Sequence, residues 1–136
     1  MKMKHVTISN AKFDESVNFY KTFCGLTVQR EMNQPGHHII FLANGEGETC
    51  VELIEAPDAP YKGTGISIGF VVDDVPAYHR MMEDKGYNPT PIFSPNPNVQ
   101  FFFVEDPNGL EIQFIKVAVM EENRELRRET GGFRAY

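Results

Sequence analysis

We predict an α+β protein made of two tandem copies of one βαβββ module. The first observation behind this prediction concerns the end of each copy. Residues 101–115 (FFFVEDPNGLEIQFI) form two apolar runs joined by Asp-Pro-Asn-Gly, residues that favour a tight turn between strands. Residues 38–55 follow the same plan around a glycine-rich turn. Each copy is therefore expected to end in a pair of antiparallel strands.

The spacing of matched residues is the second observation. Glu52 and Gln113 occupy equivalent places in the two copies and lie 61 positions apart. Gly25 and Gly86 each follow a helical pattern and are also 61 positions apart. Two copies of this length cannot form a solenoid, so we interpret them as paired halves of one domain.

The boundaries of these halves follow from a linker rich in proline and glycine, residues 56–64. The expected organisation is a single domain spanning 1–136, with modules at about 4–56 and 66–116 and a tail at 117–136. An α/β sandwich without a shared cleft is the alternative fold.

Composition excludes several classes of function. The chain has 136 residues, of which 41% are hydrophobic and 24% are charged, as in a soluble globular protein. The net charge of −6 argues against nucleic acid or an anionic membrane as a partner. No apolar stretch is long enough to span a membrane, and the N-terminus lacks the apolar core of a signal peptide. Two cysteines without framework spacing indicate free thiols in a reducing cytoplasm.

In the first half, alternation predicts a strand at 5–10 with His5 and Thr7 on one face. A helix should follow, capped by Asp14 or Ser16 and ended by Gly25. The remaining expected elements are a short strand at 26–30, a turn at 33–36, and strands at 38–43 and 49–55.

In the second half, a strand is expected at 65–72, and an aspartate at 73 or 74 should cap a helix with Pro76 in its first turn. A short strand or extended segment at 88–92 and a loop at 94–98 should precede the final pair of strands. In the last strand, Leu110, Ile112 and Phe114 should face the core, which places Glu111 and Gln113 together on the other face.

Five motifs, in this order along residues 4–116, give the chain a family resemblance. They are His5-Val-Thr, residues 16–21 (SVNFYK) with Gly25-Leu, Val51-Glu-Leu, residues 70–75 (FVVDDV), and Asp106-Pro-Asn-Gly. Together they resemble the vicinal oxygen chelate superfamily, which includes lactoylglutathione lyases, extradiol dioxygenases and bleomycin resistance proteins. The resemblance implies curved mixed sheets that enclose a cleft, a small-molecule substrate or ligand, and a homodimer.

The resemblance also implies positions for metal ligands, on the first and last strand of each module. In this chain those positions hold His5, Glu52, Ser67 and Gln113. A neutral imidazole and a carboxylate suit Zn²⁺, Ni²⁺, Fe²⁺ or Mn²⁺. Ser67 departs from the histidine and Gln113 from the glutamate that metal-using members often carry, and both are neutral donors. His5 has an alternative role as a hydrogen-bonded histidine inside the cleft.

Other side chains complete the candidate site. A carboxylate between Val51 and Leu53 requires a polar partner or a wet cleft, so Glu52 is expected to face one. The resemblance implies a catalytic role for Glu52, because glutamates at the last-strand positions of the family can shuttle a proton. Glu111, on the face of Gln113, is a second candidate acid or a surface carboxylate near a turn. The candidate residues for the wall of the substrate cleft are His38, Phe41, Phe101 and Phe103.

Three functions remain open at this point. The first is a glyoxalase-like lyase or isomerase, with a divalent metal as a possible Lewis acid. The second is a metal-free protein that binds and sequesters a small molecule, as bleomycin resistance proteins do. The third is a ring-cleaving dioxygenase, which is disfavoured because two histidines and one carboxylate are expected where His5, Ser67 and Gln113 stand.

Overall fold

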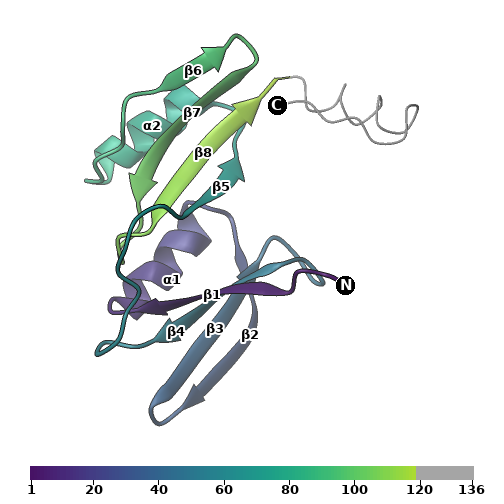
Figure 1. Cartoon of the computed structure of the whole chain (residues 1–136), viewed down its shortest axis with the longest axis vertical. Coiled ribbons are helices and arrows are strands. Elements are labelled where there is room, and N and C mark those ends of the chain that lie inside the picture. The colour runs from purple at the N-terminus through teal and green to yellow at the C-terminus, as the bar shows by residue number, and fades with distance from the viewer. Residues whose placement is uncertain (119–136) are drawn as a thin grey trace. The chain divides into compact units, whose positions relative to one another are not determined.

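The two copies form two four-stranded mixed sheets, each with one helix (Figure 1). The computed structural model describes residues 1–118. It confirms the predicted fold class, α+β with two tandem βαβββ modules. The described chain divides into two compact units, residues 1–66 with 106–110 and residues 67–105 with 111–118.

The first unit contains the sheet with strand order β1-β4-β3-β2. Strand β1 pairs in parallel with β4, whereas β3 pairs antiparallel with both β4 and β2, so the sheet is mixed. The bounds are β1 His5–Asn10, α1 Phe13–Thr22, β2 Thr27–Gln34, β3 His37–Ala43 and β4 Cys50–Glu55.

The second unit repeats this arrangement with strand order β5-β8-β7-β6. Strand β5 is parallel to β8, and β7 is antiparallel to β8 and β6. The bounds are β5 Ser67–Val71, α2 Val75–Asp84, β6 Phe93–Asn96, β7 Val99–Glu105 and β8 Glu111–Val117. Leu110, Ile112 and Phe114 are buried, as their alternation predicts.

One face of each sheet packs against the helix of its own unit. In the first unit, α1 contributes Phe19, and the sheet contributes Leu42 and Leu53; all three side chains are fully buried. Burying a side chain of this size stabilises the fold by about 1.5–3 kcal/mol. The other face of each sheet does not pack against this helix.

The helix ends follow the predictions in part. Asp74 caps α2 by accepting a hydrogen bond from the Ala77 amide, as expected. Both helices are followed by a glycine with positive φ, +67° at Gly25 and +87° at Gly86. The expected cap of α1 is wrong: Lys12 occupies the N-cap position without a side-chain hydrogen bond, and residues 14 and 16 lie inside the helix. The Ser16 hydroxyl instead points into the core.

Two strand predictions also need correction. Strand β2 extends to Gln34, well beyond the expected end at residue 30, because its second half pairs with β3 across a turn at Gly36. Residues 88–92 are not a strand, which leaves the extended segment, the other form expected there. The loop expected at 94–98 is wrong in part, because β6 occupies its first residues. Pro95 is tolerated in β6 because this is the edge strand of its sheet.

The expected tail lies almost entirely outside the described residues, which end at 118. Within those residues, neither helix combines the length and the apolar character that crossing a bilayer requires.

Candidate functional site

The sheet face opposite α1 carries the polar side chains of His5, Thr7 and Glu52. His5 pairs with Cys50, and Glu52 lies between Thr7 on β1 and Phe41 on β3. Side chains directly opposite on paired strands point to the same face, and they alternate along each strand. These five side chains therefore share one face, and the structure brings together the predicted site residues His5, Glu52 and Phe41.

Glu52 is the most enclosed charged group on this face, with 12% of its side chain exposed. Its Oε1 accepts a hydrogen bond from the Thr7 hydroxyl and lies 3.3 Å from Nε2 of His5. Its Oε2 accepts no hydrogen bond from residues 1–118. The carboxylate is thus oriented through one oxygen and keeps the other available.

His5 is positioned by contacts on two sides. Its ring meets that of Phe41 edge-on, with centroids 5.7 Å apart, and its Nε2 faces Glu52. About a third of the side chain (35%) stays exposed. His5 is therefore held between Phe41 and Glu52 in an open site.

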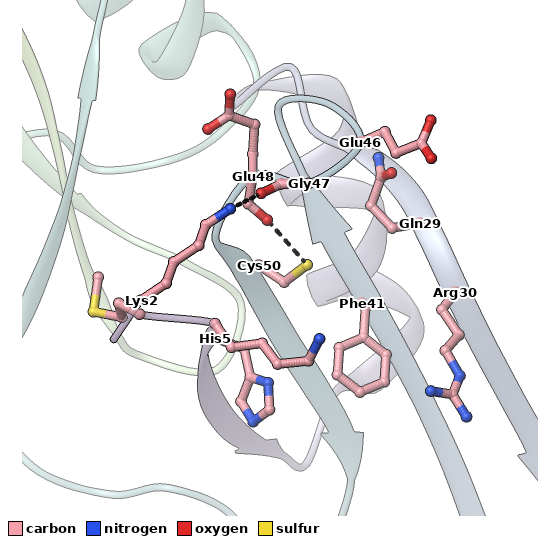
Figure 2. A pocket seen from close by; sticks show the side chains of 11 residues that line it. Lys2, His5, Gln29, Arg30, Phe41, Glu46, Gly47, Glu48 and Cys50 are labelled. Atoms are coloured by element: carbon pink, nitrogen blue, oxygen red, sulfur yellow. Dashed lines mark hydrogen bonds between the residues drawn. The ribbon is translucent and has the colours of Figure 1, made fainter.

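A pocket of about 670 Å³ opens beside His5 on the same face. Figure 2 shows His5, Cys50 and Phe41 around this space, with Gln29 and Arg30 across it on β2. The wall carries three cationic and two acidic side chains beside these groups. Its full lining is Lys2, Met3, Lys4, His5, Gln29, Arg30, Phe41, Glu46, Gly47, Glu48 and Cys50.

His38 lies on the opposite face from this pocket. Its ring contacts that of Phe13 on α1 in a tilted arrangement with centroids 4.5 Å apart, and its Nε2 lies 2.7 Å from the Glu31 carboxylate. His38 and Phe41 are three positions apart, so a regular strand points them to opposite faces. The alternation within β3 already contained this signal, and His38 is not part of the site that we propose.

The second unit carries the remaining predicted residues on the equivalent face of its own sheet. Gln113 lies between Gly69 on β5 and Phe103 on β7, and Phe101 contacts Phe103 with ring centroids 5.6 Å apart. A Cβ atom on Gly69 would stand 3.1 Å from Oε1 of Gln113, so the missing side chain makes room for the amide.

Glu111 and Ser67 lie at the end of this face near the β7–β8 turn. They pair with each other across β8 and β5, and both are exposed. Glu111 also pairs with Glu105 on β7, so it lies beside a second carboxylate. Its surroundings are those of a surface acid, with no enclosure comparable to that of Glu52.

The donors present make only part of a metal site. Two ligands at about 2.1 Å from a tetrahedral ion are roughly 3.4 Å apart, close to the 3.3 Å between His5 Nε2 and Glu52 Oε1. However, no group of three or more histidine, cysteine, aspartate and glutamate side chains suited to a metal occurs among residues 1–118. The carried-over positions 67 and 113 hold neutral donors. The residues do not fit a complete divalent-metal centre.

The clear pKa shifts lie away from this face, around the buried carboxyl of Asp106. Burial raises the pKa of Asp106, against the opposing effect of the Tyr20 hydroxyl and three backbone amides that donate to the carboxyl. Burial also raises the pKa values of Tyr20 and of Cys24, and the negative charge of Asp106 adds to both shifts. These groups belong to the core of the first unit.

Three features of the site did not emerge from the sequence. The hydrogen bond from Thr7 to Glu52 and the pairing of Cys50 with His5 depend on the register of β1 against β4. The alternation Cys50-Val51-Glu52 does place the thiol on the face of Glu52, and that signal was available. By contrast, Lys4 and Arg30 are distant in sequence, and only the folded sheet brings them to one pocket.

Comparisons with known proteins agree with this architecture. The family model described as Glyoxalase/Bleomycin resistance protein/Dioxygenase superfamily matches residues 2–114. A lactoylglutathione lyase from Haemophilus influenzae is 30% identical over 127 residues, which cover 85% of this chain and 93% of that protein. A trypanothione-dependent glyoxalase I from Leishmania major is 27% identical and has a TM-score of 0.75. The match covers 96% of this chain and 98% of that chain. An antibiotic-binding protein from Streptomyces sp. CB03234 shares the fold at 16% identity and a TM-score of 0.65. The match covers 84% of this chain and 93% of that chain.

Proposed function

The chain belongs to the Glyoxalase/Bleomycin resistance protein/Dioxygenase superfamily, and from this premise we propose that it is a glyoxalase-like lyase or isomerase of a small carbonyl compound. Glu52 is the general base that moves a proton between neighbouring carbons of the bound compound. The similarity to a lactoylglutathione lyase supports this class of reaction. The geometry around Glu52 supports the assignment of the base.

The arrangement of the two Glu52 oxygens carries the proposal. A general base must be oriented and must keep a lone pair within reach of the proton that it removes. The Thr7 hydroxyl and His5 engage Oε1, which restrains the carboxylate, while Oε2 accepts no hydrogen bond from the described chain. The low exposure of the side chain reduces competition from water. The Glu52 carboxylate is therefore held in place through Oε1, and its Oε2 can accept a proton from the ligand.

The neighbouring groups would bind and polarise the ligand. Phe41 offers an apolar ring at the pocket wall, and the cations of Lys4 and Arg30 line the same pocket. Removal of a proton next to a carbonyl places negative charge on the carbonyl oxygen, which cations or an imidazolium stabilise. His5, beside Glu52, can donate a hydrogen bond to that oxygen.

The test compares Glu52→Gln with wild type. The amide keeps the shape and can still accept from Thr7, but it cannot take up a proton. Loss of a general base costs typically 10²–10⁴-fold in rate. The readout is exchange of the substrate C–H for solvent deuterium, with a panel of small carbonyl compounds, none of them a glutathione adduct, as substrates. Glu55→Gln, an exposed residue on the same strand, is the charge-matched control. Equal exchange in wild type and Glu52→Gln would refute the assignment.

A metal-free binding protein is the second candidate. The neutral residues at positions 67 and 113, together with the lack of a three-donor group among residues 1–118, favour it. Elemental analysis of protein purified without chelator separates the two candidates when it is combined with a ligand screen. Stoichiometric divalent metal favours the enzyme, whereas metal-free protein that binds an aromatic ligand without turning it over favours sequestration. A dioxygenase has the least support, because Ser67 stands at the position where a second histidine ligand is expected.

A further inference from the structure

The pocket of about 670 Å³ has basic side chains on two sides. Lys2 and Lys4 line it from the segment that precedes β1, and Arg30 lines it from β2, the strand at the other edge of the sheet. Glu46 and Glu48 also belong to the lining, so the three cations leave one positive charge in excess, with histidine counted as neutral. The chain as a whole carries a net charge of −6. The pocket therefore has a sign opposite to that of the whole chain.

A bulge in β2 brings Gln29 and Arg30 to the same pocket. Val28 pairs with Leu42 on β3, and Arg30 pairs with the preceding residue of β3. Gln29 is thus an extra residue with no counterpart on β3. Neighbours on a regular strand point to opposite faces, yet Gln29 and Arg30 both line the pocket (Figure 2). Bulges are frequent beside functional sites, where they redirect a side chain.

The wall that carries the lysines is held by hydrogen bonds to the start of β4. The carbonyl of Lys4 accepts from the Cys50 amide at 2.9 Å. The carbonyl of Met3 accepts from the Thr49 hydroxyl at 2.8 Å. These bonds continue the pairing of β1 with β4 beyond its first residue. The backbone that bears Lys4 is therefore fixed beside the pocket, and only the side chain has to be ordered when a ligand binds.

The charges of Lys4 and Arg30 are not neutralised by the described chain. Neither side chain forms an ion pair with a carboxylate of residues 1–118. The guanidinium of Arg30 donates one long hydrogen bond, of 3.6 Å, to the sulfur of Met32. A guanidinium has five N–H donors, and its planar fork matches the two oxygens of a carboxylate. Arg30 and Lys4 thus keep donors that a bound anion can use.

We infer that this pocket binds a small monocarboxylic acid with an apolar body, whose carboxylate is held by Arg30 and Lys4 and whose body lies against Phe41. The inference goes beyond the proposed function and does not depend on it, because such an acid can bind whether or not Glu52 moves a proton. The single excess positive charge favours a monoanion over a dianion such as a phosphate monoester. Phe41 and Met3 supply apolar surface, and pockets for small molecules typically enclose about 300–1,000 Å³.

The anchor for the carboxylate lies apart from Glu52. Arg30, Phe41 and Glu52 pair in one row across β2, β3 and β4. Neighbouring strands are about 4.8 Å apart, so roughly 10 Å separate the backbones of Arg30 and Glu52. This is about one Debye length at 0.1 M ionic strength, so salt weakens the repulsion between Glu52 and a bound carboxylate. The aromatic ring of Phe41 lies between the two charged positions.

The experiment titrates the isotope-labelled full chain with benzoate and follows the amide chemical shifts. The shifts give the dissociation constant, locate the bound compound, and show that each variant is folded. Benzamide is the uncharged probe of the same shape, and phenyl phosphate is the dianionic probe. These compounds have no C–H that the proposed base would exchange, so failure to bind is distinguishable from failure of the proposed function.

The variants change the charge of the pocket in both directions. Arg30→Gln and Lys4→Gln each remove a cation, and Arg80→Gln, an exposed residue on α2, is the matched control. Glu48→Gln removes an anion from the lining, and Glu55→Gln, exposed at the end of β4, is its control. The first pair should weaken the binding of benzoate, whereas Glu48→Gln should strengthen it, because each acts on the same excess charge.

We expect benzoate to bind about tenfold or more tightly than benzamide, with shifts centred on β2 and the start of β1. Arg30→Gln and Lys4→Gln should each raise the dissociation constant by about fivefold or more, and Arg80→Gln should leave it unchanged. Equal affinity for benzoate and benzamide overturns the inference, as does an absence of shifts or shifts centred away from the pocket. Wild-type affinity in Arg30→Gln also overturns it, and tighter binding of phenyl phosphate than of benzoate overturns the assignment to a monoanion.

Discussion

The phenol of Tyr20 donates a hydrogen bond of 2.6 Å to Oδ2 of Asp106, joining helix α1 to a turn 86 positions away in the sequence. Both side chains are buried. The other oxygen of Asp106 accepts hydrogen bonds from the amides of Asn108 and Leu110, which shape the turn itself. The Asn108 side chain adds a second link, because its Oδ1 accepts from the Ala11 amide. The Asp-Pro-Asn-Gly motif is thus both a turn and an attachment point within the first unit.

Replacement of Tyr20 by phenylalanine should therefore destabilise the protein. It leaves a buried carboxyl oxygen without its side-chain donor, which costs about 1–3 kcal/mol. Burial raises the folded-state pKa of Asp106, so this group stabilises the fold below its unfolded pKa of about 3.9 and loses that contribution as pH rises through the folded value. The phenol opposes this shift in pKa. The decrease in the free energy of unfolding that Tyr20→Phe causes should therefore be larger at pH 7 than at pH 3.

Urea unfolding of wild type and Tyr20→Phe at the two pH values gives this difference. Tyr61→Phe, on the linker and only partly buried, is the control for removal of a phenol. If Tyr20→Phe lowers the free energy of unfolding by the same amount at both pH values, the phenol does not act through the charge of Asp106.

Standard glutathione-dependent glyoxalase activity should be absent or very weak, even with added Ni²⁺ or Zn²⁺. The chemistry rests on one carboxylate, because Gln113 stands where a second titratable group would be, and an amide does not titrate near neutral pH. The measurement is thioester formation from the glutathione hemithioacetal of methylglyoxal, followed by absorbance. Robust turnover would overturn this prediction and would point to Glu111 as a second base, which Glu111→Gln would then test.

Gln113→Glu should increase the affinity for a divalent metal. The family resemblance assigns position 113 to a ligand, and the change adds a charged oxygen donor in place of an amide. We expect a dissociation constant for Ni²⁺ or Zn²⁺ lower by about tenfold or more, equivalent to ~1.4 kcal/mol, by isothermal titration. Gln100→Glu adds the same charge on β7, where it alternates with Phe101 and so points to the other face. An unchanged isotherm for Gln113→Glu, or an equal gain in the control, would contradict the prediction.

The protein is expected to be a homodimer. Family resemblance motivates this expectation, together with the apolar residues 117–120 and the aromatic residues of the tail, most of which lie outside the described residues. Light scattering at micromolar concentration should give twice the chain mass of 15.5 kDa. A truncation after residue 116 should weaken the dimer if these segments form the interface. A mass of one chain for the full-length protein would count against it.

Much of the fold could be predicted from local patterns. The alternation in residues 110–115 correctly separated the buried Ile112 and Phe114 from Gln113, because neighbouring side chains on a strand must point to opposite faces. Asp74 and Gly86 were recognisable as helix ends because capping and positive φ are local demands. The cap of α1 was not recognisable: Ser16 has a capping side chain, but burial against the sheet places it inside the helix.

The sequence by itself determined the two-module architecture and the presence of Glu52 and Gln113 on the polar faces of their strands, because backbone periodicity and turn chemistry act between near neighbours. Only the tertiary structure decided what surrounds Glu52. The register of β1 against β4 sets Thr7 opposite Glu52 and His5 opposite Cys50. Pairing of β3 and β2 brings Arg30 to the pocket beside His5. Such contacts join segments far apart in the chain, and their geometry depends on strand register, which no single stretch of sequence encodes.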